Sequence, residues 1–215
     1  MQKTILIRIG EIFLKGNNKR FFESKLVDNI KNSLNGLQYR LICEHNRYSI
    51  ENFDDLDENE IIFRLKKVFG IHSISPAVKL KTDLDNIKKA AVRISPEKGV
   101  FRVTVNRADK SIPLRSMDIA ADIGAYMLEN IKDVKVNLFN YDFELSVDMR
   151  ENGYSYIFCE IIRAQGGLPV GCSGKGMLLL SGGIDSPVAG FKMAKRGVEL
   201  FAAHFYSYPY TSENA

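Results

Sequence analysis

The stretch LLLSGGIDSPVAG, residues 178–190, decides how the C-terminal part of the chain folds. Residues 177–180 are an apolar run with the length of a buried parallel strand. Residues 181–183 then predict a turn, whose two glycines are free to adopt a positive φ and leave room for a ligand. Ser186 is placed to cap a helix, and Pro187 suits the first helical position. Because free backbone N–H groups and the helix dipole converge at such a junction, the stretch predicts an anion-binding site.

Two common phosphate-binding motifs do not occur here. Lys175 lacks the following Ser or Thr and the upstream Gly that a P-loop requires, and no G-x-G-x-x-G fingerprint is found at this position. The string S-G-G-x-D-S at 181–186 instead resembles the signature of the PP-loop ATP pyrophosphatases, which hold the pyrophosphate of ATP and adenylate a substrate. The alternative is an ordinary glycine turn before a helix. The resemblance implies that Asp185 assists adenylation through Mg²⁺ and that the pyrophosphate lies against the backbone around Ser181, Gly182, Gly183 and Ser186.

The composition is that of an ordinary globular protein. The 215 residues are 45% hydrophobic, which suits one to three small domains. No run has the length of a membrane helix and the N-terminus lacks the form of a signal peptide, so we expect a cytoplasmic protein without membrane contact. The three cysteines are far apart, which indicates neither a disulfide framework nor a metal site. The net charge of +4 is compatible with RNA binding.

The N-terminal block has the periodicity of a small α+β domain. An amphipathic helix is expected over 18–34, with Phe22, Leu26, Ile30 and Leu34 on one stripe. A second helix is expected over 58–69, closed by Gly70. Strands are expected at 4–9, 37–43, 46–50 and 71–80. This β-α-β-β-α-β order is the ferredoxin-like pattern.

Two further blocks follow. In the second block we expect helices at 85–94 and 116–130, and strands at 100–106, 134–138, 143–149 and 154–162. The glycine-rich residues 164–176 are typical of a linker or an exposed functional loop. The third block is one βαβ unit, with a strand at 177–180, a helix at 187–196 and a strand at 199–205. One such unit cannot cover both faces of a parallel sheet, so we expect only part of a nucleotide-binding domain in this chain.

Four stretches together resemble one family. They are GEIFLKGNNKRFFE at 10–23, GGLPVGCSGKG at 166–176, SGGIDSPVA at 181–189 and KRGVELFAAHFYSYPYTSENA at 195–215. They are similar to the bacterial tRNA 4-thiouridine synthetases, or tRNA sulfurtransferases. The resemblance implies a multidomain α/β and α+β chain, with a ferredoxin-like domain, a THUMP domain and a Rossmann-like PP-loop domain. The corresponding residues are 1–56 (extending to about 75), 57–163 and 177–215, with a linker at 164–176.

The resemblance also implies a reaction. ATP adenylates the uridine at position eight of tRNA, and a persulfide sulfur delivered by a cysteine desulfurase displaces AMP to form 4-thiouridine. The same sulfur feeds thiazole synthesis for thiamine. Asp185 would be the catalytic residue, with ATP and Mg²⁺ as cofactors and a homodimer as a plausible assembly. The implied ATP-binding residues are Leu179, Leu180, Ser181, Gly182, Gly183, Ser186, His204 and Phe205.

Several basic residues are candidates for contact with the acceptor stem and 3′ end of tRNA. They are Lys15, Lys19, Arg20, Arg102, Arg107, Lys110 and Arg115. Their phosphate contacts would supply affinity, while RNA shape would select the substrate. The alternative for any one of them is a solvated charged surface. The resemblance has departures: the family's catalytic cysteine lies further along the PP-loop domain than Ala215, and Lys19 replaces an arginine.

Two other functions remain open from the sequence. This chain alone could be a tRNA-binding module without turnover, carried by residues 1–165. A different PP-loop synthetase acting on a small molecule is the third hypothesis, but it leaves those first residues without a role. Release of AMP and pyrophosphate that depends on tRNA distinguishes the three.

Overall fold

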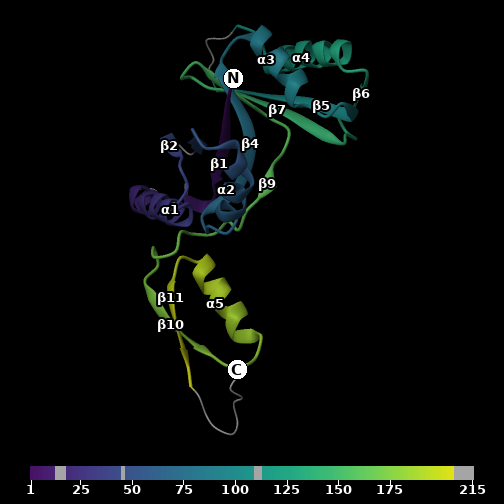
Figure 1. Cartoon of the computed structure of the whole chain (residues 1–215). Coiled ribbons are helices and arrows are strands. Elements are labelled where there is room, and N and C mark those ends of the chain that lie inside the picture. Colours follow the sequence, from purple (N-terminus) through teal and green to yellow (C-terminus); the bar gives the residue numbers. More distant parts are fainter. Residues whose placement is uncertain (13–17, 45–46, 109–112, 206–215) are drawn as a thin grey trace.

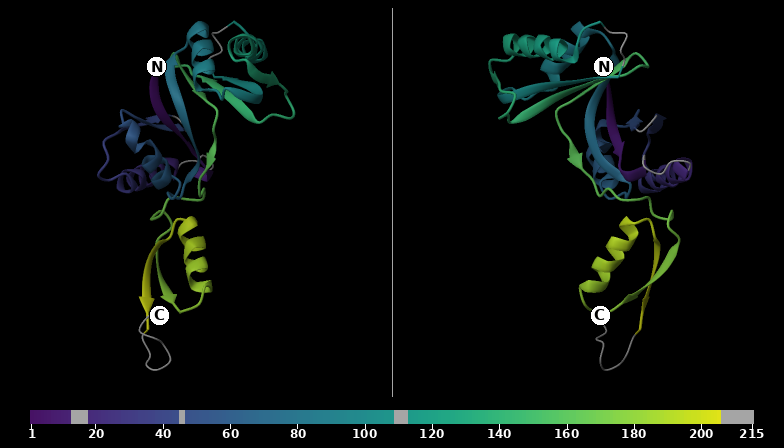
Figure 2. Two further views of the ribbon diagram at one scale, coloured as in Figure 1. Left: turned by 45° about the vertical axis from the view of Figure 1, so that its right-hand side comes forward. Right: turned by 180° about the vertical axis from the view of Figure 1, so that it is seen from behind.

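The computed structural model describes residues 1–12, 18–44, 47–108 and 113–205, which form three successive units (Figure 1). The ferredoxin-like unit lies between the other two, as the turned views also show (Figure 2). None of the helices in these described ranges combines the length and the hydropathy that crossing a bilayer requires.

The first unit has the expected β-α-β-β-α-β order. Its strands are β1 (Gln2–Ile9), β2 (Arg40–Glu44), β3 (Arg47–Glu51) and β4 (Ile71–Lys81), and its helices are α1 (Lys19–Ser33) and α2 (Glu58–Leu65), with a short 3₁₀ turn η2 (Asp55–Asp57). Leu26, Ile30 and Leu34 are fully buried and Phe22 packs beside them, which confirms the predicted stripe. Helix α2 ends at Leu65, earlier than predicted, because residues 66–70 form turns that lead to Gly70, whose φ is +100°.

The second unit follows the predicted pattern closely. Its helices are α3 (Leu84–Ile94) and α4 (Ser116–Asn130), and its strands are β5 (Lys98–Arg107), β6 (Asp133–Val136), β7 (Phe143–Met149) and β8 (Tyr154–Phe158). The single strand predicted over 154–162 is wrong: the chain breaks after β8 and resumes as β9 (Ile162–Arg163). Both pieces pair with β4, and the gap between them faces Pro76, which has no N–H to donate.

Strand β4 joins the first two units into one sheet. It pairs with β1 along one edge, and with β8 and β9 along the other. The strand order is β2-β3-β1-β4-β8-β7-β5-β6, with β9 beside β4. Each unit keeps its own helix-covered core, while Leu6, Ala77, Tyr156 and Phe158 form a small third cluster at the junction. The sheet therefore holds the two units in a fixed relation.

The third unit is a parallel βαβ unit, as predicted. It comprises β10 (Lys175–Leu180), α5 (Asp185–Lys195) and β11 (Glu199–His204). Gly190 is buried where α5 crosses the sheet, and a Cβ there would lie 2.7 Å from Leu178 Cδ2, so a larger residue would require the Leu178 side chain to shift. Large apolar side chains stay exposed on the strands, among them Met177 at 63% and Phe201 at 48%.

Residues 164–174 are anchored at both ends rather than free. The Gly70 amide donates to the Gly166 carbonyl at 2.8 Å, which ties the segment to the ferredoxin-like unit. Leu168 N–H donates to the Lys195 carbonyl at 2.9 Å, which ties it to the end of α5. Gly167 has a φ of +76°, and a Cβ there would lie 2.3 Å from the Lys195 carbonyl oxygen. The segment therefore acts as a strap between the first and third units.

Candidate nucleotide site and RNA-binding surface

A strand-to-helix loop lies at the carboxyl edge of the parallel pair β10 and β11. Leu180 and His204 end β10 and β11 in register, and His204 Nδ1 lies 3.0 Å from the Leu180 carbonyl oxygen. Residues 181–184 turn from β10 into α5 directly above this edge. The carboxyl edge is where open α/β sheets bind ligands, and the N-terminus of α5 adds free amides and a positive dipole end.

Within the loop, Ser186 does not have the predicted capping role. The helix begins at Asp185, with Ile184 at the N-cap and no side-chain cap bond. Ser186 Oγ instead accepts a hydrogen bond from Ser181 N–H at 3.3 Å and lies 3.4 Å from Ser181 Oγ. Ser186 thus lies two residues beyond the N-cap position, and its hydroxyl bonds back to the start of the loop.

Gly182 and Gly183 leave room beside the backbone and are not needed for a left-handed conformation. Gly182 and Gly183 are outside the set of residues with positive φ, so the expected left-handed turn is not formed. A Cβ at Gly182 would meet no atom within 4 Å on the protein side. The loop is therefore open to a ligand on its outer surface, where a phosphate could approach the backbone closely.

The other predicted ATP-site residues surround this loop. Leu179 is 61% exposed, Phe205 is 75% exposed, and Asp185 is exposed in the first turn of α5. Within the described residues no group of three or more His, Cys, Asp or Glu side chains is arranged to hold a metal ion. The backbone amides at the start of α5 are suited to the phosphates of a nucleotide. Asp185 is the one carboxylate of residues 181–186, so a Mg²⁺ ion would need most of its ligands from those phosphates.

The predicted RNA-binding residues do not all gather on one surface. Lys15 and Lys110 lie outside the described residues. Lys19 forms an ion pair with Glu23 at 3.5 Å, and Arg20 is exposed on α1. Arg107 and Arg115 come together at the end of β5 and the start of α4, where Arg107 donates to the Leu114 carbonyl and Arg115 pairs with Asp118.

Arg102 is less available to RNA than its sequence position suggests. Its guanidinium donates twice to Glu144 Oε2, at 3.0 and 2.6 Å, and lies 4.2 Å from the centre of the Tyr141 ring. The bond to Glu144 raises the pKa of Arg102, and Arg102 contributes to lowering the pKa of Glu144 against the opposing effect of burial. The charge of Arg102 is therefore largely offset within the protein.

Sequence reasoning missed a second basic group at the junction of the first two units. Arg8 from β1, Arg47 from β3 and Arg150 after β7 line one pocket of about 600 Å³. The signal in the sequence was weak, because each arginine lies in or beside a separate predicted strand. Only the shared sheet brings the three segments together.

Three families match successive parts of the chain. The ThiI ferredoxin-like domain matches residues 4–75, the THUMP domain matches 81–158, and the thiamine biosynthesis protein (ThiI) family matches 171–215. The crystal structure of PH1313 from Pyrococcus horikoshii is 31% identical with a TM-score of 0.81, over 94% of this chain and 69% of that one. The chain belongs to the ThiI family.

Longer ThiI-family relatives support the same assignment. A protein of Alkaliphilus metalliredigens named "Probable tRNA sulfurtransferase" is 45% identical over 222 residues, covering 100% of this chain and 56% of that protein. A solved structure described as a 4-thiouridine synthetase–RNA complex with bound ATP is 34% identical with a TM-score of 0.84, over 100% of this chain and 55% of that chain. This ThiI-family chain thus spans about half the length of the curated relatives it matches.

Proposed function

We propose that this chain supplies the RNA-binding units and the pyrophosphate loop of an enzyme that transfers sulfur to tRNA with ATP. The observation that carries the proposal is loop 181–186, placed at the carboxyl edge of β10 and β11 and strapped to a ferredoxin-like–THUMP sheet. The family and the names of the relatives support the same reaction. Cytoplasmic location follows from this proposal.

In the proposed reaction the loop holds the nucleotide through backbone amides. The N–H groups at the start of α5 lie against the pyrophosphate, because the first amides of a helix have no partner within the helix. Leu179, Leu180, His204 and Phe205 surround the nucleotide at the ends of the two strands. Asp185 lies in the first turn of α5, where its carboxylate would hold a Mg²⁺ ion brought by ATP, and such an ion would offset the charge of the leaving pyrophosphate.

The product of the proposed reaction is 4-thiouridine at position eight of tRNA. Activation of the uridine as an adenylate makes AMP a leaving group. The terminal sulfur of a persulfide, supplied by a cysteine desulfurase, attacks C4 as AMP leaves, and a second thiol then cleaves the S–S bond of the adduct, which releases 4-thiouridine and leaves a disulfide. We further propose that the same sulfur is delivered to thiazole synthesis for thiamine. We also propose that two copies of the protein bind one tRNA as a homodimer. Among the described residues, we assign Arg20, Arg107 and Arg115 to contacts with RNA phosphates. We also propose that the first domain extends to about residue 75.

Exposed apolar side chains on β10 and β11 favour a second candidate function for these residues taken alone. Met177, Leu179 and Phe201 are each about half exposed or more on a sheet of two strands. Such a sheet leaves apolar surface uncovered, which is typical of a site that is incomplete in isolation. We therefore propose that these 215 residues alone bind RNA without turnover.

The experiment is binding of this chain to an acceptor-stem minihelix over a salt series, with AMP release measured in parallel. The proposal predicts tight binding whose log K falls linearly with log salt concentration, and no AMP release. A duplex DNA of the same length serves as the control for charge alone. Binding of RNA and DNA with equal affinity and equal salt slope would contradict RNA recognition.

A further inference from the structure

An aromatic contact joins the ferredoxin-like unit to the helix that begins at the nucleotide loop. Phe69 lies in the turn between α2 and β4, and Phe191 lies on α5. Their ring centroids are 5.2 Å apart and the ring planes meet at 65°, which is an edge-to-face arrangement. Aromatic pairs of this kind prefer a defined geometry and stabilise beyond the apolar area that they bury. The contact therefore favours one position of α5 relative to the first unit.

The turn that carries Phe69 is held on both sides. The amide of Gly70 donates to the Gly166 carbonyl at 2.8 Å, and the carbonyl of Gly70 accepts from the Gly10 amide at 3.1 Å. The φ of Gly70 is +100°, and a Cβ there would lie 3.2 Å from Pro169 Cγ. Because the end of β1 and the strap enclose this turn, the ring of Phe69 is presented to α5 in a fixed place.

Helix α5 is held near its C-terminal end by the strap. Leu168 N–H donates to the Lys195 carbonyl at 2.9 Å, and two further amides of the strap donate to the Gly197 carbonyl at 2.9 and 3.0 Å. These bonds alone would let the helix pivot about its last turn. Phe191 lies four residues before Lys195, which is one turn nearer the nucleotide loop. Its contact with Phe69 therefore supplies the second point that fixes the direction of the helix.

An ion pair between Arg196 and Glu11 also crosses this boundary. Its N···O distance is 3.0 Å, but the two side chains are 59% and 45% exposed. Exposed pairs of long side chains contribute little, because ordering the side chains offsets a weak attraction in water. The aromatic pair is therefore the contact better suited to define the direction of α5.

The pyrophosphate loop lies at the other end of the same helix. Figure 1 shows α5 with its last residues toward the ferredoxin-like unit and its first residues away from it. The helix rises about 15 Å from Lys195 to Asp185, at 1.5 Å per residue. A rotation of about 5° about the last turn would therefore move the loop by about 1 Å.

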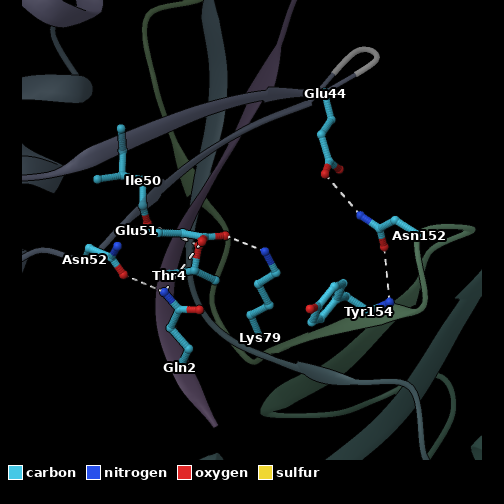
Figure 3. A network of polar contacts seen from close by, with 9 residues as sticks. All are labelled: Gln2, Thr4, Glu44, Ile50, Glu51, Asn52, Lys79, Asn152 and Tyr154. Carbon is cyan, nitrogen blue, oxygen red and sulfur yellow. Dashed lines mark hydrogen bonds and ion pairs between the residues drawn. The ribbon is translucent and has the colours of Figure 1, made fainter.

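The first two units form a single body on the other side of this contact. Lys79 of β4 forms an ion pair with Glu51 of β3 at 2.8 Å, and its Nζ lies 4.7 Å from the centre of the Tyr154 ring on β8 (Figure 3). Asn152, in the turn before β8, donates to Glu44 at the end of β2 at 3.0 Å. These contacts link strands of both units, so RNA held on either unit keeps a fixed relation to the turn between α2 and β4.

We propose that Phe69 is a positioning residue for the proposed reaction, and that it acts through Phe191 to align the pyrophosphate loop with the uridine of the bound RNA. ATP binding depends on the loop and RNA binding on basic side chains of the first two units, so neither requires the aromatic contact. The step that joins the two substrates requires their alignment, and a misplacement of about 1 Å lowers such a rate by about 100-fold. The inference rests on the proposed function, because it presupposes that these units act on one RNA.

The test replaces Phe69 by alanine in the protein that contains this chain and measures thiolation of tRNA. The kcat should fall by about tenfold or more, while the KM for ATP and the Kd for tRNA change by less than about twofold. Phe69→Tyr keeps the ring and should restore most of the kcat. Phe191→Ala should match Phe69→Ala, and the double variant should lose no more than either single variant. Phe63→Ala is the matched control, since Phe63 is exposed on α2 and its ring contacts Lys67 of the same unit.

Small-angle X-ray scattering of this chain tests the geometry without turnover. Phe69→Ala should broaden the distribution of interatomic distances, whereas Phe63→Ala should keep the wild-type distribution. An unchanged kcat in Phe69→Ala, an equal loss in Phe63→Ala, or an unchanged scattering distribution in Phe69→Ala would overturn the positioning role and leave the proposed function intact. Absence of 4-thiouridine with the wild-type protein would overturn the proposed function and the positioning role with it.

Discussion

Replacement of Gly167 by alanine should detach the nucleotide unit from the ferredoxin-like unit. The backbone of Gly167 has a φ of +76°, and an alanine Cβ would lie 2.3 Å from the Lys195 carbonyl oxygen. The left-handed conformation alone costs about 1–2 kcal/mol for a residue with a side chain. Displacing that carbonyl also breaks its bond from Leu168 N–H and leaves a buried amide unpaired, at about 1–3 kcal/mol. The sum is about 2–5 kcal/mol.

Gly166→Ala is the matched control for this prediction. Gly166 has a similar φ of +65°, but a Cβ there would meet nothing within 4 Å, so only the cost of the conformation applies. Hydrogen–deuterium exchange should show faster exchange at Leu168 and along the end of α5 in Gly167→Ala than in Gly166→Ala. Equal exchange in the two variants would refute the role of the strap, since it would mean that the contact with Lys195 holds nothing.

Three further predictions concern stability, pH and RNA affinity. Ile30→Ala should lower the free energy of unfolding by about 2–5 kcal/mol in urea titrations, whereas the exposed Lys31→Ala should change it by less than about 0.5 kcal/mol; equal effects would contradict the assigned core. Burial raises the pKa of Cys159 to about 11. In a variant whose other two cysteines are replaced by serine, the alkylation rate of Cys159 should therefore rise about tenfold per pH unit from pH 7.5 to 9.5. A plateau of the rate in that range would contradict the burial of the thiol. Arg20→Gln should reduce the slope of log K against log salt concentration for RNA binding by about 0.7–0.9. Arg102→Gln should reduce that slope less, because Glu144 offsets the charge of Arg102. A larger reduction in Arg102→Gln than in Arg20→Gln would refute the assignment of Arg20 to an RNA phosphate.

Local patterns in the sequence predicted most of the elements. The stripe of Phe22, Leu26, Ile30 and Leu34 fixed α1, because a period near 3.6 residues leaves one apolar face for a core. The string S-G-G-x-D-S placed the loop between β10 and α5, because small residues are needed where a strand meets a helix beside a ligand. Both signals depend only on residues that are close in the chain.

Features that depend on distant segments could not be predicted. The continuity of the sheet through β4 arises because both edges of one strand are paired, and a hydrophobic pattern does not reveal which strands are neighbours. The arginine pocket follows from that continuity, since Arg8, Arg47 and Arg150 meet only across the shared sheet. The pairing of Arg102 with Glu144 likewise required the parallel register of β5 and β7.

The capping role expected of Ser186 was wrong for a more local reason. A serine before a proline is a common helix start, but here Ser186 Oγ bonds back to the amide of Ser181, and the helix begins at Asp185, two residues before Pro187. The pattern was compatible with either arrangement. The return bond within the loop decided between them.

The most direct test of the account is nucleoside analysis of tRNA treated with ATP, a persulfide donor and the protein that contains this chain. The account predicts that 4-thiouridine forms only when ATP is present. Asp185→Ala should abolish its formation while leaving tRNA binding near normal, and Glu199→Ala, a carboxylate at the opposite edge of the same two strands, should retain it. Formation of 4-thiouridine at an undiminished rate by Asp185→Ala, or its formation without ATP, would contradict the account.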